Sequence, residues 1–160
     1  MIAKAKINNL EEIASLARVV TNNIHEQGID QWSDTYPLYE HFKLDLDKDA
    51  LYVFITEGKV VASISILPQN DPFYHEITWK KSSSLVVHRL MVDPNYMRMK
   101  IGSIMMSFAI QKAKNESYES MKVDTHPDNI RMQNLLKSLG FVEIGYIPGM
   151  NRIGFECVFE

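Results

Sequence analysis

The spacing of apolar residues along the chain predicts several helices. After Asn8 and Asn9, apolar residues recur at steps of three and four, which is typical of an amphipathic helix. Glu12 follows Asn9 by three positions, as in a capping box, and Gly28 suits the end of this helix. The predicted helices cover residues 10–28, 38–46, 101–115 and 130–139.

Runs rich in β-branched and aromatic residues predict a series of strands. Two of these runs are separated only by Glu57 and Gly58, and glycine tolerates the positive φ that a two-residue hairpin turn requires. The predicted strands cover residues 2–7, 51–56, 59–67, 73–79, 85–92, 121–125, 141–147 and 152–159. Because helices separate the later strands, the pattern indicates helical crossovers in a mixed sheet, either a three-layer α/β sandwich or an α+β fold.

Length and composition fit one globular domain. The chain has 160 residues, of which 46% are hydrophobic and 23% charged, so it can bury a core without disulfides and is not expected to be disordered. It has no internal repeat, low-complexity tract or long linker, and we predict a single domain over residues 1–160. The formal net charge of -3 disfavours nucleic acid and anionic lipid as partners.

Cysteine and histidine usage points away from disulfides and metal sites. Cys157 is the only cysteine, which excludes an internal disulfide and fits a reducing compartment. The histidines show no pair at i and i+4 and no neighbouring cysteine, so we predict no structural metal. No run approaches the roughly 20 apolar residues of a membrane span, and the N-terminus lacks the apolar core of a signal peptide. We therefore expect a cytoplasmic protein without a membrane partner.

The turn that follows the predicted strand 85–92 is a candidate anion site. Amides at a helix start have no partner within the helix and lie at the positive end of its dipole. Arg98 and Lys100 stand where that dipole disfavours cations, which favours a bound anion beside them. The alternative interpretation is a solvated basic turn in which Gly102 only allows close packing.

This turn resembles the coenzyme loop of the GCN5-related N-acetyltransferases (GNAT), which transfer an acetyl group from acetyl-coenzyme A to an amine. In that family a strand runs into a Val-x-Pro segment and then an Arg/Gln-x-x-Gly-x-Gly/Ala loop. Val92, Pro94 and Gly102 match this pattern. Met97 replaces the Arg or Gln, and Lys100 replaces the first glycine. The resemblance implies the GNAT fold, a mixed and mostly antiparallel central sheet flanked by helices.

A second GNAT-like motif lies later in the sequence. It follows the spacing of a late helix and strand in the family and consists of Asn129, Leu135, Gly140 and Phe141. The resemblance implies that Asn129 helps to hold the coenzyme. Leu136 stands where members of the family carry a tyrosine that protonates the departing thiolate. The resemblance therefore identifies no general acid in this chain.

The resemblance also assigns a set of residues to acetyl-coenzyme A. The strand residues would bind the pantetheine arm through their backbone, and the loop residues would bind the pyrophosphate. This set comprises Leu90, Met91, Val92, Met97, Arg98, Met99, Lys100, Ile101, Gly102, Ser103 and Asn129. For residues 90–92 the alternative is a role in the core, and both interpretations can hold together because backbone and side chain act separately.

Two residues are candidates for the base that deprotonates the acceptor amine. Asp124 lies five residues before Asn129, where some relatives that acetylate protein N-termini carry a glutamate base. The alternative for Asp124 is a strand-end carboxylate that faces solvent or caps the next turn. Histidine titrates near neutral pH, which makes His88 the second candidate. The alternative for His88 is a hydrogen-bonded residue of the core or its boundary.

We therefore predict an N-acetyltransferase that acetylates a primary amine of a small molecule or peptide by direct attack. The rival hypothesis is a regulatory module that keeps the fold and acyl-coenzyme binding but has lost transfer activity, and Met97, Lys100 and Leu136 motivate it. The loops at residues 28–37 and 68–84 are expected to select the acceptor. Because relatives often pair through late strands, the resemblance also suggests a homodimer.

Overall fold

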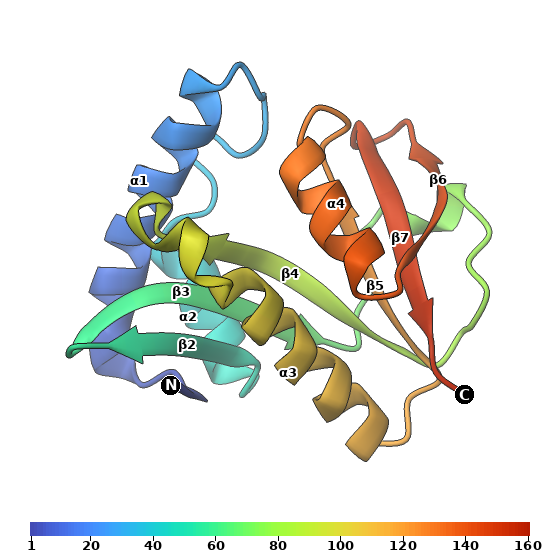
Figure 1. Cartoon of the computed structure of the whole chain (residues 1–160), viewed down its shortest axis with the longest axis horizontal. Coiled ribbons are helices and arrows are strands. Elements are labelled where there is room, and N and C mark those ends of the chain that lie inside the picture. The colour runs from blue at the N-terminus through green and yellow to red at the C-terminus, as the bar shows by residue number, and fades with distance from the viewer. The chain divides into compact units, whose positions relative to one another are not determined.

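The computed structural model describes residues 1–160, and its strands form one mixed sheet flanked by helices (Figure 1). The strands are β1 (Ile2–Lys4), β2 (Leu51–Thr56), β3 (Lys59–Leu67), β4 (Ser84–Val92), β5 (Ser120–Thr125), β6 (Val142–Ile147) and β7 (Arg152–Val158). The helices are α1 (Leu10–Glu26), α2 (Tyr39–Asp47), α3 (Ile101–Asn115) and α4 (Ile130–Ser138). The strand order is β1-β2-β3-β4-β5-β7-β6. β4 and β5 pair in parallel, whereas β1 with β2, β2 with β3, and β7 with both β5 and β6 pair antiparallel. This confirms the predicted fold class.

The chain divides into two compact units. Unit 1 comprises Met1–Ser65 and Arg89–Met105, and unit 2 comprises Ile66–His88 and Met106–Glu160. β3, β4 and α3 each contribute residues to both units. The assignment of residues 1–160 to a single domain stays a prediction. None of the helices is both long enough and apolar enough to span a bilayer.

A β hairpin and two helices build most of unit 1. Glu57 and Gly58, which join β2 to β3, have φ values of 53° and 75°, as a two-residue turn with two left-handed positions requires. The predicted hairpin is therefore confirmed. α1 and α2 pack against this hairpin (Figure 1) and share an apolar core with it. The core includes Leu10, Ile13, Leu16, Ala17, Val20, Phe42, Leu51, Val53 and Val60.

The first helix forms as predicted but begins differently. The side-chain oxygen of Asn9 accepts a hydrogen bond from the Lys6 amide at 2.8 Å, and so it closes the 3-10 turn that precedes α1. Glu12 accepts a hydrogen bond from the Val60 amide at 2.8 Å, which ties α1 to β3. The predicted capping box is wrong, because both side chains have partners outside the helix.

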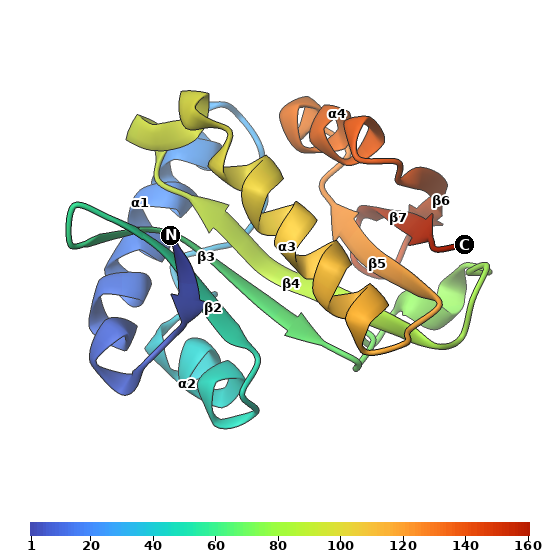
Figure 2. The same cartoon turned by 60° about the horizontal axis from the view of Figure 1, so that its bottom comes forward.

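Unit 2 contains β5, β6 and β7, with α4 alongside them (Figures 1 and 2). The strand predicted over residues 73–79 is wrong, because a 3-10 turn occupies Tyr74–Glu76. Ile77 and Trp79, which follow this turn, pack over Gly154 of β7 and do not form a strand. A Cβ atom added to Gly154 would lie only 2.7 Å from Ile77 Cδ1 and 2.8 Å from the Trp79 ring. The glycine therefore makes room for this crossing segment.

Candidate active site

The turn expected to bind pyrophosphate lies wholly in unit 1, between β4 and α3. A 3-10 turn occupies Pro94–Met99, and Asp93 anchors it. The Asp93 carboxylate accepts a hydrogen bond from the Asn95 amide at 2.9 Å and lies 3.4 Å from the Lys59 ammonium. The Asp93 side chain is only 6% exposed, and these contacts hold the start of the turn next to Lys59 at the beginning of β3.

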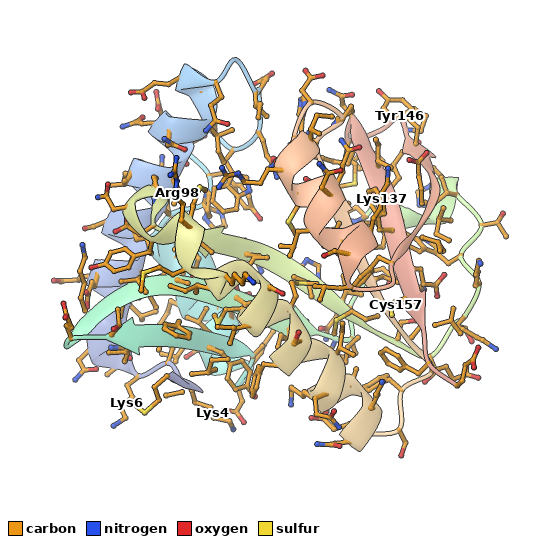
Figure 3. All side chains as sticks on the ribbon, in the orientation of Figure 1. Lys4, Lys6, Arg98, Lys137, Tyr146 and Cys157 are labelled. Atoms are coloured by element: carbon orange, nitrogen blue, oxygen red, sulfur yellow. The ribbon has the colours of Figure 1, made fainter.

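The backbone conformation of Lys100 explains why GNAT loops carry glycine at this position. Its φ of 59° and ψ of 24° place it in the left-handed region, which glycine enters without a steric cost. Ile101 to Ser103 form the first turn of α3, and the amides of a first turn suit an anion because the helix itself gives them no partner. Arg98 and Met99 are exposed beside them, and Figure 3 labels Arg98 in the turn before α3. The turn thus keeps the backbone shape of an anion site although its side chains differ.

We expect Lys100→Gly to stabilise the protein by up to about 1 kcal/mol, because it relieves the left-handed strain of a residue with a Cβ atom. Lys100→Ala removes the same charge but keeps the Cβ atom, so it should bring no such gain. The midpoints of urea denaturation of the two variants measure the difference. Equal stability of the two variants would contradict a backbone origin.

Residues 90–92, which the resemblance assigns to pantetheine, lie beyond the ladder that joins β4 to β5. That ladder pairs Ser84, Leu85 and Val86 with β5. Within unit 1 the Met91 side chain is only 2% exposed and belongs to the core cluster. Met91 therefore has the core role that the sequence left open, while its backbone is not committed to the parallel ladder.

A carboxylate in unit 2 stands in an unusual environment. Asp124 lies on β5, and its Oδ2 accepts a hydrogen bond from the Tyr74 hydroxyl at 2.7 Å. Burial raises the pKa of Asp124 to about 6. The hydrogen bond from Tyr74 opposes this rise, whereas the charge of Asp71 and its hydrogen bond to Asp124 add to it. Arg152 acts in the opposite direction and lowers the pKa of Asp124. The carboxyl group can therefore both hold and release a proton close to neutral pH.

Asp71 links the two catalytic candidates that the sequence indicates. Besides its hydrogen bond with Asp124, Asp71 places Oδ1 3.4 Å from Nδ1 of His88. The other ring nitrogen of His88 lies 3.0 Å from the Gln69 carbonyl oxygen. His88 is thus a hydrogen-bonded residue at the core boundary, as its alternative interpretation stated. Sequence reasoning missed Asp71, because no pattern marks a single acidic residue in a polar loop.

Tyr74 is a second residue of this cluster that the sequence did not reveal. It is almost fully buried, and burial, together with the charges of Asp124 and Asp71, raises its pKa well above the ordinary value. The hydroxyl therefore stays protonated and donates to Asp124. Trp79 fixes Tyr74 in place, because its ring lies 4.8 Å away and its Nε1 donates to the Tyr74 carbonyl at 2.9 Å.

Three positions in the region of the later motif have structural roles in unit 2. Asn129 caps α4, since its Oδ1 accepts a hydrogen bond from the Met132 amide at 3.1 Å. Leu136 is fully buried in α4 and offers no proton donor. Gly140, with a φ of 93°, follows this helix in the left-handed conformation that is typical of a helix end. The role of Asn129 in coenzyme binding stays a prediction.

Comparison with known proteins agrees with the fold and the motifs. The model of the acetyltransferase (GNAT) family matches residues 9–141, while no curated protein matches the chain significantly. A GNAT-family acetyltransferase from Streptococcus agalactiae 2603 has 21% identity and a TM-score of 0.88, with 100% of this chain and 95% of that chain covered. One from Listeria monocytogenes 4b F2365 has 16% identity and a TM-score of 0.80, with 99% and 94% covered. The PaiA N-acetyltransferase of Thermoplasma acidophilum, solved with coenzyme A, has 14% identity and a TM-score of 0.79, with 99% and 98% covered.

Proposed function

Since this chain belongs to the acetyltransferase (GNAT) family, we propose that it transfers an acetyl group from acetyl-coenzyme A to a primary amine of a small molecule or peptide. The observation that carries this proposal is the Asp124 cluster. A carboxyl group whose pKa lies at about 6 is ionised at neutral pH and still basic enough to accept a proton. Carboxyl groups whose pKa is shifted by burial together with a specific charged neighbour, as Asp124 is by Asp71, are concentrated at functional sites.

The turn in unit 1 supports the coenzyme part of the proposal. Acetyl-coenzyme A supplies the activated acetyl group, and its pyrophosphate is an anion that suits the positive end of the α3 dipole. In the proposal, residues 97–103 hold the pyrophosphate, residues 90–92 bind pantetheine through their backbone, and Asn129 helps to hold the coenzyme. Lys100 keeps the left-handed backbone of the glycine that it replaces.

The acidic cluster supports direct attack by the amine. Asp124 takes the proton that the ammonium must lose before its nitrogen can bond to the thioester carbonyl carbon. Asp71, hydrogen-bonded to Asp124 and 29% exposed, passes this proton outward with His88 beside it. As the carbon–sulfur bond breaks, the leaving thiolate takes a proton from water, because Leu136 offers none.

The only cysteine favours direct attack over a covalent acyl-enzyme. Burial raises the pKa of the Cys157 thiol, although the charge of Lys114 opposes this rise. Since the thiolate is the nucleophilic form, a raised pKa leaves Cys157 a poor acyl acceptor at neutral pH. In the proposed reaction the amine therefore attacks the thioester directly, and Asp124 acts as a base and not as a nucleophile.

The proposal is tested by coenzyme binding and by turnover. We expect acetyl-coenzyme A and coenzyme A to raise the melting temperature, whereas adenosine nucleotides at the same concentration raise it less. At a hundred times the dissociation constant, a ligand adds about 2.7 kcal/mol, or several degrees. We also expect thiol release from acetyl-coenzyme A with at least one member of a panel of primary amines. Coenzyme binding without turnover on the whole panel would favour the regulatory module.

A further inference from the structure

In unit 1, all three nitrogens of the Arg89 guanidinium group donate hydrogen bonds, and these bonds connect elements that lie far apart in the sequence. Arg89, on β4, donates from Nε to Oδ2 of Asp45 at 2.7 Å and from Nη2 to Oδ1 of Asp45 at 2.6 Å. Ser65 donates to the same carboxylate at 2.6 Å. The Arg89 and Asp45 side chains are only 14% and 3% exposed. This is a largely buried, bidentate ion pair between β4 and α2.

The third nitrogen of the Arg89 guanidinium group bonds to the loop between α1 and α2. Its Nη1 donates to the Tyr36 hydroxyl oxygen at 2.7 Å. The bond leaves the hydroxyl hydrogen of Tyr36 available as a donor. Burial alone would lower the pKa of Arg89, but its bonds to Asp45 and the attraction of Tyr36 and Asp45 raise it. Arg89 therefore stays charged and holds both partners at once.

The loop of residues 29–38 is also fixed from its two flanking helices. Arg18 of α1 donates from Nη1 to the Ser33 carbonyl at 2.7 Å and from Nη2 to the Pro37 carbonyl. His41 of α2 accepts a hydrogen bond on Nδ1 from the Leu38 amide at 2.8 Å. Residues 29–38 contain no helix, yet they are bonded to α1, α2 and β4. Arg89 supplies the bond to the strand.

The backbone at Arg89 shows that this arrangement has an energetic cost. Arg89 has a φ of 51° within β4, and a residue with a Cβ atom in the left-handed region costs about 1–2 kcal/mol. A buried ion pair is moreover a weak way to gain stability, since apolar side chains of similar volume often do as well. Strain and a buried charge at one residue are typical of a functional constraint. Residues 90–92, which follow Arg89 directly, are those that the proposed function gives to pantetheine.

We propose that Arg89 is a positioning residue for acetyl transfer. It holds Tyr36, and with it the loop of residues 29–38, at a fixed place relative to residues 90–92, and so it sets where the acceptor amine is presented. The inference rests on the proposed function, because it assigns the loop to the amine and not to the coenzyme. It predicts that a weaker bond between Arg89 and Tyr36 affects the amine selectively.

The test uses Tyr36→Phe, which removes one hydroxyl and leaves the ion pair of Arg89 intact. Tyr146→Phe is the matched control, since the exposed Tyr146 of β6 (Figure 3) donates a single bond to Asn151 at 2.7 Å. With an amine that the wild-type protein acetylates, we expect Tyr36→Phe to lower kcat/KM for the amine about tenfold. The KM for acetyl-coenzyme A should stay within about twofold, and Tyr146→Phe should leave both constants unchanged.

Amide hydrogen exchange gives a readout that does not depend on activity. The amides of Ser33 and Tyr36 bond to each other's carbonyls at 2.8 Å and 3.3 Å. Tyr36→Phe should make these amides exchange faster while the amides of α1 and β2 keep their wild-type rates. Arg89→Lys keeps the charge but loses the planar fork, so it should loosen the same loop.

The outcomes separate this inference from the proposed function. Amine kinetics that stay unchanged in Tyr36→Phe overturn the positioning role, even if the loop exchanges faster. An equal rise in the KM for acetyl-coenzyme A also overturns it, because the loop would then act on the coenzyme. Failure of the wild-type protein to acetylate any amine contradicts the proposed function instead, and this appears before any variant is compared.

Discussion

Replacing Asp124 by Asn is expected to lower kcat/KM for the acceptor amine about a hundred- to ten-thousand-fold, the range for loss of a positioned base. The asparagine keeps the size of the side chain, and its oxygen can still accept the hydrogen bond that Tyr74 donates at 2.7 Å. Only the ability to take a proton is lost. Thiol release at saturating acetyl-coenzyme A measures the effect. Asp128→Asn, at a side chain that is 72% exposed, is the control and should retain wild-type activity.

Acid should inactivate the wild-type protein through the same residue. With the pKa of Asp124 at about 6, kcat/KM should fall as the pH drops through this value, because the protonated carboxyl group is no longer a base. Asp71→Asn removes a charge that raises this pKa, so the fall should move to lower pH. The comparison uses one amine for both proteins, and the titration of the amine itself is then common to both. An unchanged midpoint would contradict the coupling of the two carboxyl groups.

Replacing Asp124 by Asn should raise the stability of the protein at neutral pH, although it lowers the activity. The pKa of Asp124 is raised to about 6 in the folded protein from about 3.9 for an unfolded aspartate. The folded state therefore binds the proton more tightly, and this contribution to stability falls as the pH rises from about 4 to about 6. At neutral pH the ionised carboxylate destabilises the fold, so Asp124→Asn should unfold at a higher urea concentration than the wild-type protein. A variant that lost both activity and stability would indicate a structural role.

Local sequence signals correctly predicted the elements whose conformation is determined by neighbouring residues in the sequence. The hairpin of residues 51–67 was predicted correctly, since Glu57 and Gly58 by themselves determine a tight two-residue turn. The strand at residues 73–79 was predicted wrongly. Its apolar residues belong to a segment that packs across Gly154, and a glycine so distant in the sequence cannot be recognised from local periodicity.

The residues of the candidate site also fall into two groups, those that the sequence predicted and those that only the structure revealed. Asp124 was predicted from its position five residues before Asn129 and His88 from the titration range of histidine, and the structure joins them through Asp71. No spacing rule could have found Asp71, nor the bond between Tyr36 and Arg89, which are 53 positions apart. Motifs identify residues that act next to one another along the chain. Contacts made by tertiary packing become visible only in the folded structure.

The largest loss of stability is expected from Asp45→Ala. This change leaves the guanidinium of Arg89, which is 14% exposed, without its bidentate partner. Removing one member of a buried ion pair typically costs about 3–5 kcal/mol. The exposed pair of Lys43 and Asp47 on the same helix lies at 2.6 Å and provides the control. Asp47→Ala should cost less than about 1 kcal/mol, because solvent screens exposed pairs. Urea denaturation of both variants measures the difference.

A double replacement separates stability from positioning. Asp45→Leu combined with Arg89→Met removes both charges, so no unpaired ion remains and the double variant should be more stable than Asp45→Ala. It cannot restore the bond to the Tyr36 hydroxyl, which comes from the Arg89 guanidinium. We therefore expect recovered stability together with a kcat/KM for the amine that stays about tenfold low. Recovery of both quantities would mean that Arg89 serves the fold alone. Recovery of neither would mean that the shape of the pair, and not its charge, holds α2 against β4.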